Sequence, residues 1–305
     1  MKLINSLDLK NGKRLEMWDF SQSNRSEKDR YETVSGVASI CFQSTGVDPK
    51  KLYDKLYTES IGLPSSSFEF VPVVVNEEMS QRIDNGYASV CNLSKDIVQY
   101  PNIMRFGTLI AASGSVYTLT NLRAVLSDIE FLKQYGITIN IDELNSNLLG
   151  EAIALRNFFV FKIKADISCM RQLMRHRVSW QEMSRRYVSA KKVPFEFLVN
   201  DDMKKACVDG MNYREYFELS TKFYEDCMSN GAHQQEARRF IPVCQMTEVW
   251  MAADYTKLIN MLKLRTKSST QQDTREIAIA MTKMLKQFGE EIDEKRIIED
   301  VSCIC

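Results

Sequence analysis

Two kinds of apolar pattern occur along this chain, and together they restrict the fold to a mixture of sheet and helix. The runs FEFVPVVV at 68–75 and FFVFKI at 158–163 are rich in β-branched and aromatic residues, which is typical of buried strands. Pro72 limits the first run to an edge strand or a broken one. Elsewhere apolar residues recur at helical spacing, as at Leu122, Val125, Leu126, Ile129 and Leu132. We predict one compact α+β domain over 1–305, in which a mixed or antiparallel sheet is flanked by long helices.

Capping residues indicate where several helices begin and end. Asp48 followed by Pro49 is typical of an N-cap and a first helical residue. Asn212 and Glu215 have the spacing of a capping box, in which each side chain accepts from the backbone of the other. Gly231 is expected to end the helix that this box begins.

The remaining segments give coarser predictions. Residues 1–30 are polar and mixed in charge, and we expect a surface extension there. Residues 76–110 have little pattern, and a helix is expected from about 167 to 175. From 234 to 289 the pattern is nearly all helical, with a break near Pro242.

Composition excludes several classes of protein. The chain has 305 residues, with 40 Lys and Arg against 40 Asp and Glu, so no basic surface covers the whole molecule. With two histidines and no C-x-x-C pair, the eight cysteines predict no metal site. No apolar leader and no run of about 18 apolar residues occur, so we predict a cytoplasmic protein with free thiols and no membrane contact.

Positive charge is concentrated between 171 and 192, where seven Lys or Arg residues accompany one acid, Glu182. A run of charges commonly forms a solvated helix face. Here the cations alternate with Trp180, Met183 and Tyr187, and arginines packed among apolar residues are costly unless an anion neutralises them. Arginine also suits bidentate binding of phosphate, so this segment is a candidate phosphate site.

Two further arginine groups lie downstream, Arg238 with Arg239 and Arg265 with Arg275. Cations from three separated segments favour a small phosphorylated ligand held from several sides. A nucleic-acid groove would more often present one continuous basic face. No Gly-rich phosphate loop occurs, so neither a Rossmann nor a P-loop fold is predicted.

The same segments resemble motifs of the flavin-dependent thymidylate synthase family. Residues 175–187, RHRVSWQEMSRRY, resemble its Arg-His-Arg motif and the serine that follows. Residues 236–242 resemble its Ala-Arg-x-x-Leu-Pro segment, and 65–70 resemble its Ser-x-Phe-Glu element. Residues 260–265 and 271–275 resemble its later Asn-to-Arg helix and Gln-x-x-x-Arg pair. The motifs stand in the family's order over about 200 residues.

The resemblance implies methylation of dUMP at C5, with methylenetetrahydrofolate as carbon donor and NADPH as reductant through FAD. It also implies a homotetramer whose active sites combine residues of several subunits, and no nucleic-acid partner. The residues it marks as catalytic are Arg265 and Ser184, the serine as a ligand contact rather than a nucleophile. Its dUMP contacts are Gln172, Arg175, Glu182, Ser184, Arg185, Arg186, Arg238 and Arg265. Its FAD contacts are Glu69, Arg175, His176, Arg177, Asp254, Asn260 and Gln271.

This sequence departs from the family pattern at several places. Pro64 replaces a common histidine, and Asp254 and Thr256 stand where an Asn and an Arg often hold the flavin. Lys257 is a candidate replacement for the missing cation. The Arg-His-Arg motif and its serine are separated by six residues, one fewer than usual. A largely helical insertion at 76–155 is expected between the first motif and the strand at 158–163.

Other functions stay open at this stage. A related pyrimidine-nucleotide C5 hydroxymethylase would use water in place of hydride. A nucleic-acid-binding module built on 171–192 predicts steep salt dependence. An inactive homologue would bind dUMP without oxidising NADPH. Cys169 and Cys244 could be nucleophiles of a cysteine-dependent synthase, but neither has an activating neighbour in sequence, and we predict buried structural thiols.

Overall fold

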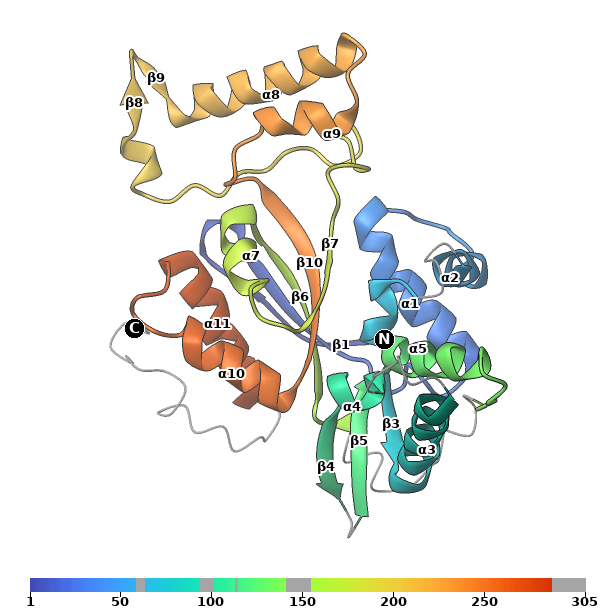
Figure 1. Cartoon of the computed structure of the whole chain (residues 1–305). Helices are drawn as coiled ribbons and strands as arrows, with labels where there is room; N and C mark the ends of the chain where they lie inside the picture. The colour runs from blue at the N-terminus through green and yellow to red at the C-terminus, as the bar shows by residue number, and fades with distance from the viewer. Residues whose placement is uncertain (59–63, 94–100, 113–114, 141–154, 287–305) are drawn as a thin grey trace.

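A five-stranded antiparallel sheet forms the centre of the molecule (Figure 1). The computed structural model describes residues 1–58, 64–93, 101–112, 115–140 and 155–286. In spatial order the strands are β1 (Lys2–Asp8), β2 (Arg14–Asp19), β6 (Phe158–Asp166), β10 (Met246–Asp254) and β7 (Ser179–Glu182). Every neighbouring pair is antiparallel, so the predicted α+β class is confirmed.

The two faces of this sheet bury alternate residues of the same strands. On β6, Phe161 and Ile163 enter one core while Val160 enters the other, as the two-residue period of a strand requires. The first core is covered by helices, which are α7 (Ile167–Leu173), α10 (Tyr255–Arg265) and α11 (Gln272–Lys286). The second core is covered by α1 (Glu27–Phe42), whose Val37 packs there. Helix α7 begins where expected.

The segment 234–289 contains β10, an interior strand of the main sheet, which corrects the nearly all-helical prediction. It begins with the short helix α9 (Gln234–Ala237) and a 3-10 turn, Arg238–Phe240. The strand β10 then pairs along its whole length with β6 and over four residues with β7. Its sequence, MTEVWMAAD, favours no strand by itself. Burial on both faces and two ladders of backbone hydrogen bonds decide its conformation.

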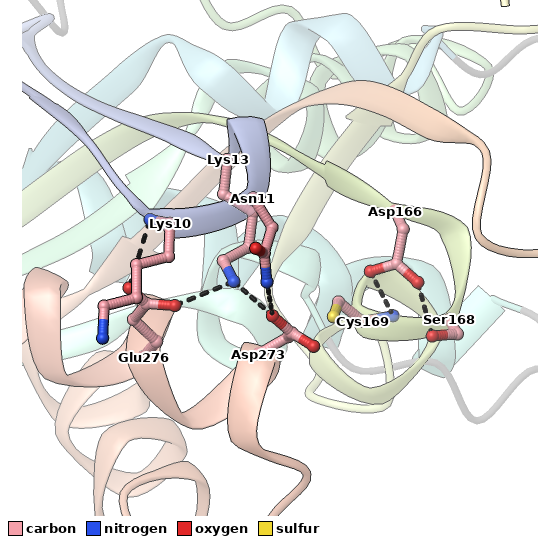
Figure 2. A network of polar contacts seen from close by, with 8 residues as sticks. All are labelled: Lys10, Asn11, Lys13, Asp166, Ser168, Cys169, Asp273 and Glu276. Atoms are coloured by element: carbon pink, nitrogen blue, oxygen red, sulfur yellow. Dashed lines mark hydrogen bonds and ion pairs between the residues drawn. The ribbon is translucent and has the colours of Figure 1, made fainter. Parts of the chain in front are cut away.

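The first 19 residues also belong to the main sheet, so the predicted surface extension is wrong. Leu15 and Met17 of β2 are buried in the first core. In the turn between β1 and β2, Asn11 has the left-handed φ of 59°, which asparagine tolerates. Just after this turn, the side chain of Lys13 is fully buried and forms ion pairs with Asp273 and Glu276 of α11 (Figure 2). This network attaches the N-terminal hairpin to the last described helix.

A second sheet of three strands lies beside the first (Figure 1). Its order is β3 (Pro72–Asn76), β5 (Ser115–Asn121) and β4 (Thr108–Ala112). The 3-10 turn η2 (Ser66–Phe70) precedes β3, and Pro72 occupies the first position of an edge strand, as predicted. Its helices are α2 (Pro49–Thr58), α3 (Glu77–Leu93), α4 (Asn102–Phe106) and α5 (Leu122–Lys133).

The described part of the insertion 76–155 is largely helical, as predicted, and it also contains the two strands β4 and β5. The strand β5 has the β-rich sequence SVYTLTN, and it pairs antiparallel with β4. Buried Asp128 of α5 joins the helices, because it accepts hydrogen bonds from Tyr87 Oη (2.6 Å) and from the backbone N–H groups of Asn102 (2.8 Å) and Ile103 (2.9 Å). Residues 141–154 of the insertion lie outside the described part.

One helical segment projects away from both sheets (Figure 1). It consists of the short strands β8 (Cys207–Val208) and β9 (Met211–Asn212) and the helix α8 (Tyr213–Ser229). The predicted capping box of Asn212 and Glu215 is present. Tyr216, Leu219 and Phe223 follow one side of α8 and are exposed. No helix in the described ranges is both long and apolar enough to span a bilayer.

Candidate functional site

A cleft of about 660 Å³ opens between α7, the end of β7 and the turn after α9. We call it the arginine cleft, and its polar side chains are Arg171, Glu182, Ser184, Arg185, Arg238, Arg239, Gln245 and Thr247, of which Arg185 is buried. These residues come from three segments that the β6–β10–β7 pairing brings together. Several cations around one carboxylate form a site that suits a small anion with hydrogen-bonding groups.

Glu182 is the acid of the arginine cleft. Burial raises the pKa of its carboxyl, and the Thr247 hydroxyl together with the positive charges of Arg171 and Arg238 offsets part of that rise. The pKa of Glu182 is therefore set by a balance between burial on one side and the Thr247 hydroxyl and two arginines on the other. A bound anion that shields these arginines would raise the pKa further.

The predicted dUMP residues 184–186 have different environments. Ser184 Oγ accepts from the Arg186 backbone N–H at 3.3 Å, and among the described residues no side-chain base hydrogen-bonds to it. Arg185 is buried, and its guanidinium donates to the carbonyls of Val193 (2.6 Å) and Pro194 (3.2 Å). Arg186 is exposed and lies over the ring of Tyr187. The contacts of Arg185 give it a structural role, whereas Ser184 and Arg186 are accessible.

A second cleft, of about 790 Å³, lies between the main sheet and the insertion. We call it the insertion cleft. Its charged side chains are Glu69, Arg105, Arg123, Arg177, Asp254 and Lys257. Arg123 forms an ion pair with Glu69, and Lys257 forms one with Asp254 at 2.6 Å. Asp254 also caps α10, because its side chain accepts from the Lys257 backbone N–H.

A third set of predicted residues lies at the ends of α7 and α10. We call it the histidine group, and it consists of Gln172, Arg175, His176, Arg265 and Gln271. Arg265 Nε donates to His176 Nε2 at 2.9 Å, and Gln172 Nε2 donates to Gln271 Oε1. Burial and the charge of Arg265 lower the pKa of His176, so the imidazole is neutral at pH 7. Burial and the charge of Arg175 lower the pKa of Arg265.

The structure thus places most of the predicted site residues of one chain in three groups, and Arg186 and Asn260 lie outside all three. Arg238 lines the arginine cleft, whereas Arg265 belongs to the histidine group and lines neither cleft. Asn260 is exposed on α10 and also lines neither cleft. The expectation that Arg186, Arg238 and Arg265 converge on one ligand is therefore not met within a single chain.

Several residues of these clefts were not among the predicted contacts. Arg171 and Arg239 line the arginine cleft, and both belong to charge clusters that were visible in the sequence. Arg105 and Arg123 line the insertion cleft, although the insertion carried no recognisable motif. Only the tertiary structure, which places α4 and α5 at the same cleft as Asp254 and Lys257, could reveal them.

The cysteines agree with the thiol prediction. Burial raises the pKa of the Cys169 thiol, and it raises that of Cys244 to about 11. Neither forms a thiolate at neutral pH, which is the state that a nucleophile needs. The cysteines at 41, 169, 207, 227 and 244 are all free.

Comparison with known proteins finds similarity in the region that bears the site. Residues 156–288 match the family model described as thymidylate synthase complementing protein. The chain is 26% identical over 157 residues to the flavin-dependent thymidylate synthase of Aquifex aeolicus, which covers 47% of this chain and 49% of that protein. It is 26% identical over 171 residues to that of Pyrococcus abyssi, which covers 53% of this chain and 69% of that protein. A solved UMP/dUMP methylase, PolB of Streptomyces cacaoi, is 21% identical over 43% of this chain and 69% of that one, with a TM-score of 0.36.

Fold and site define an α+β protein with an arginine-lined cleft beside its main sheet. The part of the chain that matches the thymidylate synthase complementing protein model is residues 156–288, which is less than half of its 305 residues. The matching region begins at β6 and extends past α11, so it contains the arginine cleft and the histidine group. The chain spans about half the length of the Aquifex relative, and the insertion lies outside the family match.

Proposed function

We propose that this protein is a flavin-dependent thymidylate synthase, which methylates dUMP at C5. The carbon donor is methylenetetrahydrofolate, and NADPH is the reductant through FAD. One observation carries the proposal: Glu182, Ser184 and Arg238, which the resemblance assigns to dUMP, line the same cleft although Arg238 lies over fifty residues from the others. The names of the relatives support the same activity.

The arginine cleft is the proposed dUMP site. Arg171 and Arg238 bind the 5′-phosphate as charge-assisted donors, and the Ser184 hydroxyl adds a hydrogen bond. Glu182 contacts a polar edge of the sugar or base. Ser184 acts here as a ligand contact, because no described residue hydrogen-bonded to it is the base that a serine nucleophile needs.

Arg265 is the proposed catalytic residue. Uracil C5 is a weak nucleophile, and a fixed positive charge near N3 and the carbonyl oxygens stabilises the negative charge that develops in the pyrimidine. Arg265 is held in place by its hydrogen bond to neutral His176, and a guanidinium keeps its charge throughout. FAD supplies the hydride chemistry when bound, so the protein has to bind, orient and polarise.

The proposed assembly is a homotetramer with shared active sites. In one chain, Arg238 and Arg265 belong to different groups, so a common dUMP site requires a second copy to bring them together. The exposed Tyr216, Leu219 and Phe223 of α8 offer an apolar face for that copy. The cytoplasm is the proposed location.

The insertion cleft is the proposed FAD site. Three predicted FAD contacts line it, namely Glu69, Arg177 and Asp254. Lys257 supplies a cation there, as expected for a chain with Thr256 in place of the family's arginine. The acid at 254 is already paired with Lys257, so Arg177 is the better donor to a flavin phosphate.

The test is NADPH oxidation by the purified, FAD-supplied protein, with and without dUMP and methylenetetrahydrofolate. We expect oxidation that depends on both, and a nucleotide product heavier than dUMP by one methyl group in place of a hydrogen. A hydroxymethyl product would favour the related hydroxymethylase. A flavin spectrum that does not change when dUMP is added, together with salt-dependent binding of oligonucleotides, would instead favour the nucleic-acid-binding module.

A further inference from the structure

The insertion cleft is built from two parts of the chain with different origins. Segments of the family-matching region supply one wall, which includes Phe158, Arg177, Asp254 and Lys257. The insertion supplies the other wall, which includes Asn102, Arg105, Thr120 and Arg123. Helix α4 ends against α10, because Lys257 Nζ donates to the carbonyl of Phe106 at 3.2 Å. The insertion is therefore in direct contact with the family region at this cleft.

The charges of the cleft do not cancel. Its four cationic residues are Arg105, Arg123, Arg177 and Lys257, and its two acids are Glu69 and Asp254. Each acid is already in an ion pair, with Arg123 and with Lys257. Arg105 and Arg177 are exposed and form no ion pair with any described residue. Two guanidiniums, one from each wall, thus remain available for an anionic ligand.

A buried hydroxyl in the same cleft also lacks a partner. Thr120 of β5 lines the cleft, its side chain is 4% exposed, and its Oγ1 makes no hydrogen bond with any described residue. Buried polar groups in proteins are nearly always hydrogen-bonded, so this one is best explained by a ligand that completes the site. The hydroxyl lies on the insertion side, with Arg105.

Size and apolar lining limit the class of ligand. The cleft has a volume of about 790 Å³, within the range of sites for nucleotide-sized molecules. Phe106, Leu119 and Phe158 give it apolar surface next to the free guanidiniums. A ligand with a flat ring and a diphosphate matches both features.

We propose that the insertion forms one wall of the flavin nucleotide site, where Arg105 pairs with Arg177 to bind the FAD diphosphate and Thr120 hydrogen-bonds the same ligand. The inference rests on the proposed function and adds residues that the family match does not contain. It also gives the insertion a role, since Arg105 adds a cation on the wall that faces Arg177.

Quenching of flavin fluorescence on titration with FAD tests the proposal. Arg105→Gln should weaken FAD binding roughly ten- to hundredfold, the usual effect of losing a charge-assisted hydrogen bond. Thr120→Val keeps the side-chain shape and should weaken binding less. Lys133→Gln removes an exposed cation from α5 outside the cleft and is the matched control, with no expected change.

Two further measurements separate the phosphate from other causes. Riboflavin, which has no phosphate, should bind equally to the wild type and to Arg105→Gln. ADP should compete with FAD for the wild-type cleft. Competition by methylenetetrahydrofolate instead of ADP would overturn the assignment, because the cleft would then bind the carboxylates of the folate. Arg105→Lys should recover part of the lost affinity, since it restores the charge.

The outcomes distinguish this inference from the proposed function. Calorimetry should show unchanged dUMP binding to Arg105→Gln, because Arg105 lies outside the arginine cleft. If the wild type binds no FAD, the proposed function fails and this inference fails with it. If the wild type binds FAD and Arg105→Gln binds it equally well, the inference alone is wrong.

Discussion

At the scale of single residues, the positions of Arg265 and His176 depend on each other. They lie 89 positions apart and share a hydrogen bond of 2.9 Å from Arg265 Nε to His176 Nε2. This bond requires a neutral imidazole with an unprotonated Nε2, which agrees with the lowered pKa of His176. The proposed catalytic guanidinium is therefore positioned by a neutral acceptor rather than by an acid, so its charge is not neutralised.

The lowered pKa of His176 predicts a pH dependence. The unfolded chain takes up a proton near pH 6.5, before the folded chain does, so stability falls as pH drops from about 6.5 through the folded pKa. Carbon-bound imidazole protons followed by NMR in a His233→Gln background should show the low pKa directly. His176→Gln should remove this part of the pH slope of stability. A pKa of 6.5 or above for His176 would contradict the hydrogen bond to Arg265.

Arg238 carries a second prediction at this scale. Its charge lowers the pKa of Glu182 against the effect of burial, and it is a proposed phosphate donor. Arg238→Gln should raise the KM for dUMP roughly ten- to hundredfold and raise the pKa of Glu182 further. Steady-state kinetics across pH measure both effects. Arg214→Gln, an exposed arginine at the start of α8, is the control, and equal effects of the two variants would argue against the arginine cleft as the dUMP site.

At the scale of elements, the N-terminal hairpin is held to α11 by one buried lysine (Figure 2). Burial pulls the pKa of Lys13 down, but its hydrogen bonds and charge interactions with Asp273 and Glu276 outweigh that effect, and the pKa is raised. A buried lysine is tolerated here because two carboxylates neutralise it. The hairpin in turn adds β1 and β2 to the sheet beside β6.

Lys13→Met should destabilise the fold by about 3 kcal/mol, because it leaves two carboxylates facing each other without a cation. Since the folded pKa of Lys13 is raised, its contribution is complete below pH ~10.4 and is lost as pH rises through the folded pKa. Chemical denaturation at pH 8 and above pH 10 measures both effects. Lys10→Met is the control, because the exposed Lys10 contacts Glu276 only through its backbone N–H. If Lys13→Met and the wild type had the same free energy of unfolding at pH 8, the hairpin would be held by its apolar residues alone.

At the scale of the whole molecule, the projecting helix α8 exposes an apolar face that a partner would cover. Tyr216 is 49% exposed and Phe223 is 51% exposed, on the same side of the helix. Large apolar side chains in a row on a surface usually mark an interface. A second copy placed there would cover this face, and shared active sites would explain why Arg238 and Arg265 lie apart in one chain.

Phe223→Asp should therefore shift the protein from an oligomer toward smaller species and lower its dUMP-dependent activity together. Light scattering after size-exclusion chromatography measures the mass. Glu225→Lys changes the charge on the opposite side of α8, given 3.6 residues per turn, and should leave the mass unchanged. A wild-type monomer with full activity would contradict the proposed assembly.

Local sequence determined the elements whose signals lie within a few residues. The capping box at Asn212, the edge position of Pro72, and α5 with its regular apolar spacing were all predictable, because hydrogen bonds and side-chain periods of short range specify them. The cationic motif at 175–187 also gave the resemblance to flavin-dependent thymidylate synthases, and the family model matches the same region. The sequence therefore predicted the kind of residues that form the site in this region.

Only the tertiary structure decided which strands pair in the main sheet and which charged residues lie together. Residues 246–254 have no strand pattern of their own, and they form a strand because β6 and β7 pair with its two edges. Residues 1–19 have a polar sequence, but they belong to the main sheet, and Lys13 forms ion pairs there with Asp273 and Glu276. The grouping of Arg105 with Arg177, 72 positions later in the chain, likewise depends on how the insertion packs. Pairing, burial and long-range charge compensation are interactions between distant residues, so a local pattern cannot encode them.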